Sequence, residues 1–135
     1  MRPPHRRQSF AAQRFADRRR REDEAPRLSD RAPGLASLRF DIADRHGPSG
    51  GADTQHTRII VLDRAPALFV FPCGDRACND GGHDLTDGVM RALAAARERF
   101  ELTHVCDGTI ADARCGRELH VVATATYHAA PPRVD

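Results

Sequence analysis

The sequence predicts an α+β domain: a small antiparallel sheet of about four strands, in the order β-β-β-α-β, with one helix packed across a face. Short segments of alternating or continuous apolar residues predict the strands, and one longer segment with apolar residues three and four positions apart predicts the helix. Four cysteines in glycine-containing turns predict a metal site that stabilises this small core. We therefore expect an arm over residues 1–33, a domain over 34–130 and a tail over 131–135.

Four segments have the pattern of strands. Residues 37–43 and 119–127 alternate between the two faces, which is typical of strands with one buried side. Residues 58–62 are rich in β-branched side chains, and residues 68–71 form an apolar run that ends at Pro72. We expect the four segments to pair in one antiparallel sheet.

The helix is expected from about Leu85 to Phe100. Its apolar residues are spaced by four, four, three and four positions, so they share one face, which we expect to pack on the sheet: Leu85, Val89, Leu93, Ala96 and Phe100. Asp84 or Thr86 can cap the free N–H groups of the first turn.

Positive charge is concentrated in the arm. All 21 basic residues of the chain are arginine, which together with abundant alanine indicates a GC-rich, bacterial coding background. Residues 1–33 carry ten arginines against five acidic residues, a net charge of +5, while the remaining residues have a net charge of −3. We expect a disordered or partly helical arm. If the partner is a nucleic acid, its contacts are predicted at Arg6, Arg7, Arg14, Arg18, Arg19, Arg20 and Arg21.

The cysteines form two pairs with the pattern C-x4-C, 27 residues, C-x8-C. One pair precedes the predicted helix and the other follows it, and each lies among glycines, which allow the tight turns that ligand loops need. Thiolates at such positions can converge on one tetrahedral Zn²⁺. The predicted zinc ligands are Cys73, Cys78, Cys106 and Cys115.

In joining two cysteine turns around one metal, residues 73–116 resemble zinc-ribbon and treble-clef domains. Those families usually place two residues between paired cysteines, whereas four and eight stand here, so both loops are expected to be wider. The resemblance implies a zinc scaffold with four cysteine ligands and assigns no activity.

Other interpretations of the cysteines stay open. Four unliganded buried thiols, two disulfides, or an iron–sulfur cluster would each use the same residues. The C-x4-C spacing resembles the opening of plant-type ferredoxin motifs, but the following C-x2-C is absent. His83 is a candidate additional or substitute ligand, and with Asp84 it could serve an open catalytic metal. The simpler interpretation of His83 is a turn residue near the helix cap.

The sequence favours a binding protein over an enzyme. It contains neither of the motifs H-E-x-x-H and G-x-G-x-x-G. No apolar segment approaches the ~18 residues of a membrane span, and no apolar region follows the basic N-terminus, so we expect a cytoplasmic protein without a membrane partner.

The leading functional hypothesis is a small zinc-binding adaptor or regulator that binds an unknown protein or nucleic acid. The alternatives are a thiol-based redox sensor that releases zinc on oxidation, and a small metal-dependent enzyme using His83 and Asp84.

Overall fold

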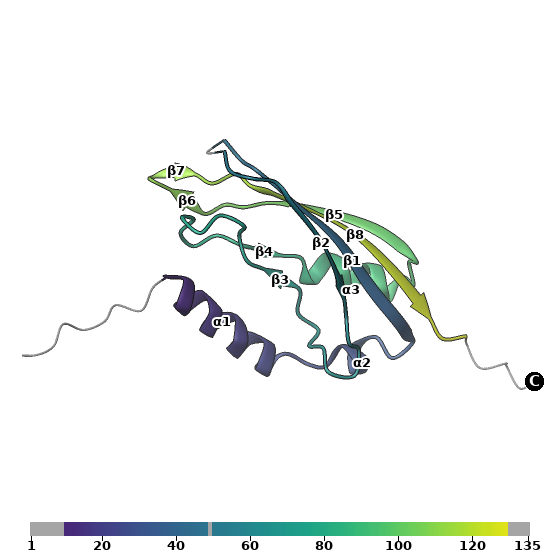
Figure 1. The fold of residues 1–135 in the computed structure, drawn as a ribbon. Helices are drawn as coiled ribbons and strands as arrows, with labels where there is room; N and C mark the ends of the chain where they lie inside the picture. Colours follow the sequence, from purple (N-terminus) through teal and green to yellow (C-terminus); the bar gives the residue numbers. More distant parts are fainter. Residues whose placement is uncertain (1–9, 49, 130–135) are drawn as a thin grey trace, which may run out of the picture.

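The computed structural model describes residues 10–48 and 50–129 (Figure 1). Its elements in chain order are α1 (Phe10–Glu24), α2 (Leu28–Arg31), β1 (Leu35–Arg45), β2 (Thr54–Ile59), β3 (Val70–Phe71), β4 (His83–Asp84), α3 (Thr86–Ala94), β5 (Arg99–Val105), β6 (Thr109–Ile110), β7 (Ala113–Arg114) and β8 (Glu118–Tyr127). Among these described residues, no helix is long and apolar enough to cross a membrane.

The main sheet has four antiparallel strands in the order β2-β1-β8-β5. Its register places Phe40 opposite Ala123 and Ala123 opposite Phe100, and all three side chains are buried on one face. Helix α3 covers that face through Val89 and Leu93, which belong to the same core cluster (Figure 1). The predicted α+β class with a four-stranded antiparallel sheet is therefore confirmed.

The identity of two strands in the sheet differs from the prediction. The segment 68–71 was expected in the main sheet, but only Val70–Phe71 is extended, and it pairs with β4 in a separate two-stranded ladder. The fourth strand of the main sheet is β5, so its elements follow the order β-β-α-β-β. The predicted strand 58–62 overlaps β2 only at residues 58–59, because β2 is an exposed edge strand formed by the polar residues that precede them.

The predicted helix was too long. It ends at Ala94, and Ala96 adopts a left-handed conformation with φ of 53°, which breaks the helical path. Ala96 is consequently exposed instead of buried, and Phe100 packs in the core from β5. The helical spacing of apolar residues extends past the end of α3 in the sequence because Phe100 is also a core residue, although it belongs to β5.

The N-terminal residues contact the domain at several places. Leu28 is completely buried in the core, its N–H donates to the carbonyl of Ala65, and the N–H of Ala67 donates to the carbonyl of Pro26. Helix α1 lies beside β3, on the side away from the main sheet (Figure 1). The N-cap residue of α3 is Leu85, which has no side-chain cap, and the residue before it, Asp84, accepts a hydrogen bond from the N–H of Thr86 at 3.0 Å.

The helix–sheet contact gives a direct stability prediction. Replacing Leu93 with alanine is expected to lower the free energy of unfolding by ~2–5 kcal/mol, because its buried side chain would leave a cavity. Arg91→Ala, on the exposed side of α3, is expected to change stability by less than about 0.5 kcal/mol. Equal shifts of the two melting temperatures would contradict the assigned buried face.

Candidate metal centre

The four cysteines come from two loops at one end of the sheet. Cys73 and Cys78 lie between β3 and β4, while Cys106 follows β5 and Cys115 precedes β8. The loops are joined where Asn79 and Thr109 exchange two backbone hydrogen bonds of 2.8 and 3.0 Å. The β6–β7 hairpin therefore returns the chain to the first cysteine loop, and the long C-x8-C spacing is accommodated by this hairpin.

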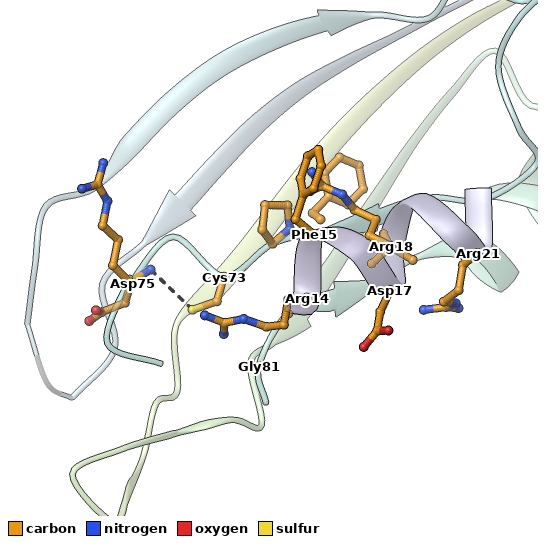
Figure 2. A pocket seen from close by; sticks show the side chains of 13 residues that line it. Arg14, Phe15, Asp17, Arg18, Arg21, Cys73, Asp75 and Gly81 are labelled. Atoms are coloured by element: carbon orange, nitrogen blue, oxygen red, sulfur yellow. Dashed lines mark hydrogen bonds between the residues drawn. The ribbon is translucent and has the colours of Figure 1, made fainter. Parts of the chain in front are cut away.

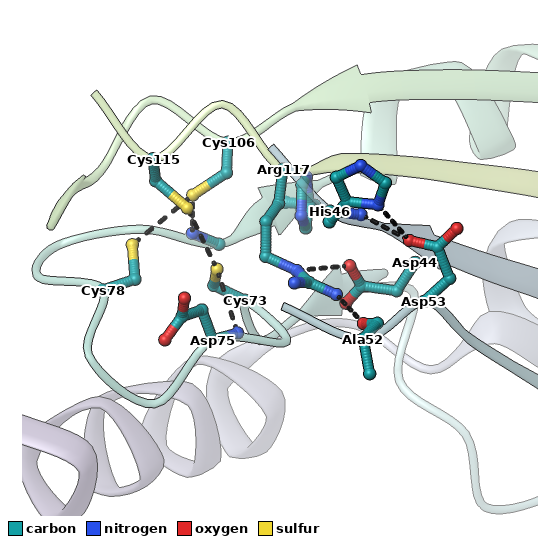
Figure 3. A network of polar contacts seen from close by, with 12 residues as sticks. Asp44, His46, Ala52, Asp53, Cys73, Asp75, Cys78, Cys106, Cys115 and Arg117 are labelled. Atoms are coloured by element: carbon teal, nitrogen blue, oxygen red, sulfur yellow. Dashed lines mark hydrogen bonds and ion pairs between the residues drawn. The ribbon is translucent and has the colours of Figure 1, made fainter. Parts of the chain in front are cut away.

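The sulfur atoms converge. The Sγ atoms of Cys73 and Cys115 are 3.6 Å apart, as are those of Cys78 and Cys106, and all four lie within 4.8 Å of one another (Figure 3). A tetrahedral ion with Zn–S bonds of about 2.3 Å would hold its sulfurs about 3.8 Å apart. The set therefore has the size of a shell around one ion. In a two-iron cluster, thiolates on different irons would be farther apart.

Glycines provide the space around the sulfurs. A Cβ atom on Gly81 would collide with the Sγ atoms of Cys78 and Cys106. One on Gly108 would lie 2.5 Å from the Sγ of Cys78. Any other residue at these two positions would push a side chain into the cluster. Glycine is therefore required at these two positions because the backbone passes too close to the sulfur atoms to leave room for a Cβ atom.

Backbone N–H groups point at two of the sulfurs. The N–H of Asp75 donates to Cys73 at 3.5 Å, and that of Gly82 donates to Cys106 at 3.4 Å. Such donors stabilise a thiolate, which is the form that binds a metal. Four thiolates without a cation would repel one another, so the arrangement fits a site completed by a cation.

Burial and hydrogen bonding act on the thiols in opposite directions. Burial raises the pKa of Cys73 to about 12 and raises the pKa of Cys78 above its ordinary value as well. Burial, the largest single influence, acts in the same direction on Cys106, but the N–H groups of Gly108 and Gly82 together with the neighbouring cysteine thiols lower the pKa of this thiol. Since a bound metal requires thiolates, its binding must release protons and must weaken as the pH falls.

A buried ion pair supports the cluster from the side of the sheet. Arg117 Nε donates to Asp44 Oδ1 at 2.8 Å, and the two side chains are only 4% and 8% exposed (Figure 3). The backbone carbonyl of Arg117 accepts a hydrogen bond from the N–H of Cys106 at 2.7 Å. The side chain of Arg117 also donates, through Nη2, to the carbonyl of Ala52 at 2.9 Å. This one residue thus connects the β1–β2 loop with the cysteine loops. Neither Asp44 nor Arg117 is among the site residues predicted from the sequence.

His83 lies close to the cluster but contacts another histidine. Its side chain is 1% exposed, and its Nδ1 is 2.8 Å from the Nδ1 of His104 on β5. Burial and the neighbouring His104 lower the pKa of His83 to about 4, so its imidazole is neutral at pH 7. Within the described residues its Nε2 has no hydrogen-bond partner. The four-residue cluster of close ligand atoms consists of the cysteines and does not include His83.

The arginines predicted to contact nucleic acid have different surroundings. Arg6 and Arg7 lie outside the described residues. Two of the others contact the domain: Arg14 donates to the carbonyl of Cys78, and Arg21 forms an ion pair of 3.0 Å with Asp84. Arg20 is paired with Asp17 at 2.7 Å, and Arg18 lies 3.9 Å from Glu22. Arg19 is exposed and makes no polar side-chain contact with the described part of the chain.

Comparison of the chain with protein-family models, with curated proteins and with solved structures found no match, so the functional assignment rests on the geometry of the cysteine cluster and its surroundings.

Proposed function

We propose that the protein is a non-enzymatic zinc-binding adaptor or regulator, in which one structural Zn²⁺ is held by Cys73, Cys78, Cys106 and Cys115. The convergence of the four sulfurs within 4.8 Å is the observation that carries this proposal. Four protein thiolates complete the tetrahedral shell of zinc and leave no position for a reactive water, an arrangement typical of structural sites. Tetrahedral sulfur sites also suit iron, so metal analysis decides between the two.

The partner is proposed to be a protein or a nucleic acid that contacts the exposed side of α1. Arg19 and Arg20 are exposed there, and Arg14 and Arg21 attach the same helix to the domain. Arginine side chains donate paired hydrogen bonds to phosphates and carboxylates. The ion pairs of Arg18 and Arg20 with residues of their own helix reduce the charge that is free for a partner.

A redox sensor is the second candidate, because one of the four sulfurs is accessible. Cys73 is half-buried, whereas the other three cysteines are buried, and it lies on the wall of a cavity. An exposed zinc-bound thiolate can react with peroxide, and its oxidation would release the metal. The test is the rate at which millimolar peroxide releases zinc. If this rate does not exceed the rate at which peroxide oxidises an unliganded cysteine, the result would argue against a sensor role.

The enzyme alternative receives less support from its two named residues. His83 is almost completely buried and contacts His104, and the carboxylate of Asp84 is held by Arg21 and by the N–H of Thr86. His83 is therefore closed off from solvent, and Asp84, although exposed, is already engaged by two partners.

The experiment that tests the proposal is elemental analysis of the reduced, folded full chain, purified without added metal. We expect one equivalent of zinc per chain, because four thiolates form a single complete shell. Less than about half an equivalent of any metal would contradict the site, and one equivalent of iron would replace zinc in the proposal. The ultraviolet spectrum and gel analysis of the same preparation test whether nucleic acid or protein is retained.

A further inference from the structure

A cavity of about 630 Å³ separates α1 from the loop that carries Cys73 (Figure 2). Its volume is within the ~300–1,000 Å³ of sites that bind small molecules. Helix α1 contributes one wall, and β3 with the following cysteine loop contributes the other. The contacts of Arg14 with Cys78 and of Arg21 with Asp84 hold the helix across this space.

The interior of the cavity is partly apolar. Phe15 is 53% exposed although it is a large aromatic residue, and it lines the cavity together with Val70, Phe71 and Pro72. Figure 2 shows Phe15 on the side of α1 that faces the cysteine loop. An apolar body placed here would cover aromatic surface that the chain itself leaves in contact with water, which is favourable at ~25 cal/mol per Å².

The charged groups around this apolar interior are mostly positive. Four arginines and two aspartates line the cavity. Asp17 is paired with Arg20 at 2.7 Å, and Asp75 accepts from the N–H of Ala77 at 2.9 Å, so both carboxylates already have partners.

Two of the lining arginines are available to a ligand. Arg76 makes no polar side-chain contact with any described residue, and Arg18 lies above the ring of Phe15 with only a 3.9 Å contact to Glu22. The cavity thus combines an aromatic surface with accessible guanidinium groups, which is suited to a molecule with an apolar body and an anionic group.

We propose that this cavity binds a small organic anion, such as an aromatic carboxylate or sulfonate. The apolar body packs against Phe15 and Pro72, and the anionic group accepts hydrogen bonds from Arg18 or Arg76. This inference goes beyond the proposed zinc site and requires only that the folded domain keeps α1 in place.

The test compares two fluorescent probes with nearly the same aromatic body. One is the anion 1-anilinonaphthalene-8-sulfonate, and the other is uncharged N-phenyl-1-naphthylamine. We expect the sulfonate to bind the full, metal-loaded chain with one molecule per chain. Arg18→Gln combined with Arg76→Gln should weaken its binding by about tenfold and leave the neutral probe almost unchanged, because a lost charge-assisted hydrogen bond is worth about that factor.

Two further variants control for charge and for the apolar surface. Arg58→Gln with Arg99→Gln removes the same charge at exposed positions outside the cavity and should leave both probes unaffected. Phe15→Ala should weaken both probes. The metal content and melting temperature of every sample are measured first, so a failure of the zinc site is recognised separately.

Several results would overturn the proposal. If the folded, metal-loaded protein binds neither probe at a defined stoichiometry, the proposed site does not exist. Equal loss of sulfonate binding in the two arginine double variants would show that only the overall charge matters. Sulfonate binding that survives in Arg18→Gln with Arg76→Gln would place the probe elsewhere.

Discussion

Replacing Cys106 with serine is expected to abolish the cooperative thermal unfolding of this domain and to remove its bound metal. Cys106 is completely buried, its Sγ is 3.6 Å from that of Cys78, and its N–H is bound to the carbonyl of Arg117. A serine hydroxyl is not ionised at neutral pH, so it cannot replace a thiolate as a zinc ligand.

The size of the expected effect follows from the energy of metal binding. Structural zinc contributes about 10–16 kcal/mol in small zinc peptides, whereas domains are stable by only about 5–15 kcal/mol. Losing even half of the metal contribution would exceed the stability of many domains. Wild-type protein treated with a strong chelator under reducing conditions is therefore expected to lose the same transition in circular dichroism.

A matched control lies in the same loop. Ala113→Ser adds a hydroxyl at an exposed position of β7 and should leave the metal content and the melting temperature unchanged. If the chain with Cys106→Ser kept one equivalent of metal and the wild-type transition, Cys106 would not be a ligand and the proposed site would be wrong.

The cysteine cluster could be predicted because its signals are local. Each cysteine pair stands in a turn with glycines, one before the helix and one after it. Strand β5, which follows α3, returns the chain to the end of the sheet where the first pair lies. The close packing of Gly81 and Gly108 against sulfur atoms explains why glycine marks these turns. The wide C-x8-C loop was also expected, although its internal hairpin was not.

Two elements of the fold were not predicted, each for a physical reason. Helix α3 ends at three consecutive alanines, residues favourable to a helix, and Ala96 takes a left-handed conformation without the glycine that usually signals it. The first two residues of β5, Arg99 and Phe100, were thereby assigned to the helix, and no strand was predicted over residues 101–105. In β2 every residue is exposed, so no alternation of apolar side chains could indicate the edge strand Thr54–Ile59.

The buried ion pair did have a signal in the sequence. Asp44 continues the inward-facing series of β1 that contains Phe40 and Ile42, and Arg117 precedes Leu119 and Val121 in the inward series of β8. One charged residue at an inward position of β1, and one of opposite sign just before β8 in phase with its inward residues, indicate a buried pair. Their proximity depends on the pairing of β1 with β8, which the sequence did not specify.

Asp44→Asn is expected to destabilise the domain by ~3–5 kcal/mol, because it leaves the guanidinium of Arg117 buried without its negative partner. Burial by itself would lower the pKa of Arg117, but the carboxylate of Asp44 raises it, so this side chain is held in its charged form. The asparagine keeps the volume of the side chain, which separates the effect of charge from that of a cavity. Chemical denaturation gives the difference in stability.

The control is an exposed ion pair on the same two strands. Glu118 lies 3.7 Å from Arg45, with the two side chains 41% and 56% exposed, and Glu118→Gln is expected to cost at most about 1 kcal/mol. Adding Arg117→Met to Asp44→Asn should restore part of the lost stability, because the unpaired charge is removed. Similar costs for Asp44→Asn and Glu118→Gln would contradict the interpretation of Arg117 as a buried charge dependent on Asp44.

The same pair should also affect the metal. The carbonyl of Arg117 accepts the N–H of Cys106, and Arg117 lies two residues after Cys115, so loosening its side chain disturbs the backbone of both proposed ligands. Zinc transfer to a competing chelator is therefore expected to be faster in Asp44→Asn than in Glu118→Gln. If stability fell while the transfer rate stayed at the wild-type value, the ion pair would support the sheet alone and the cysteine loops would be held by their own hydrogen bonds.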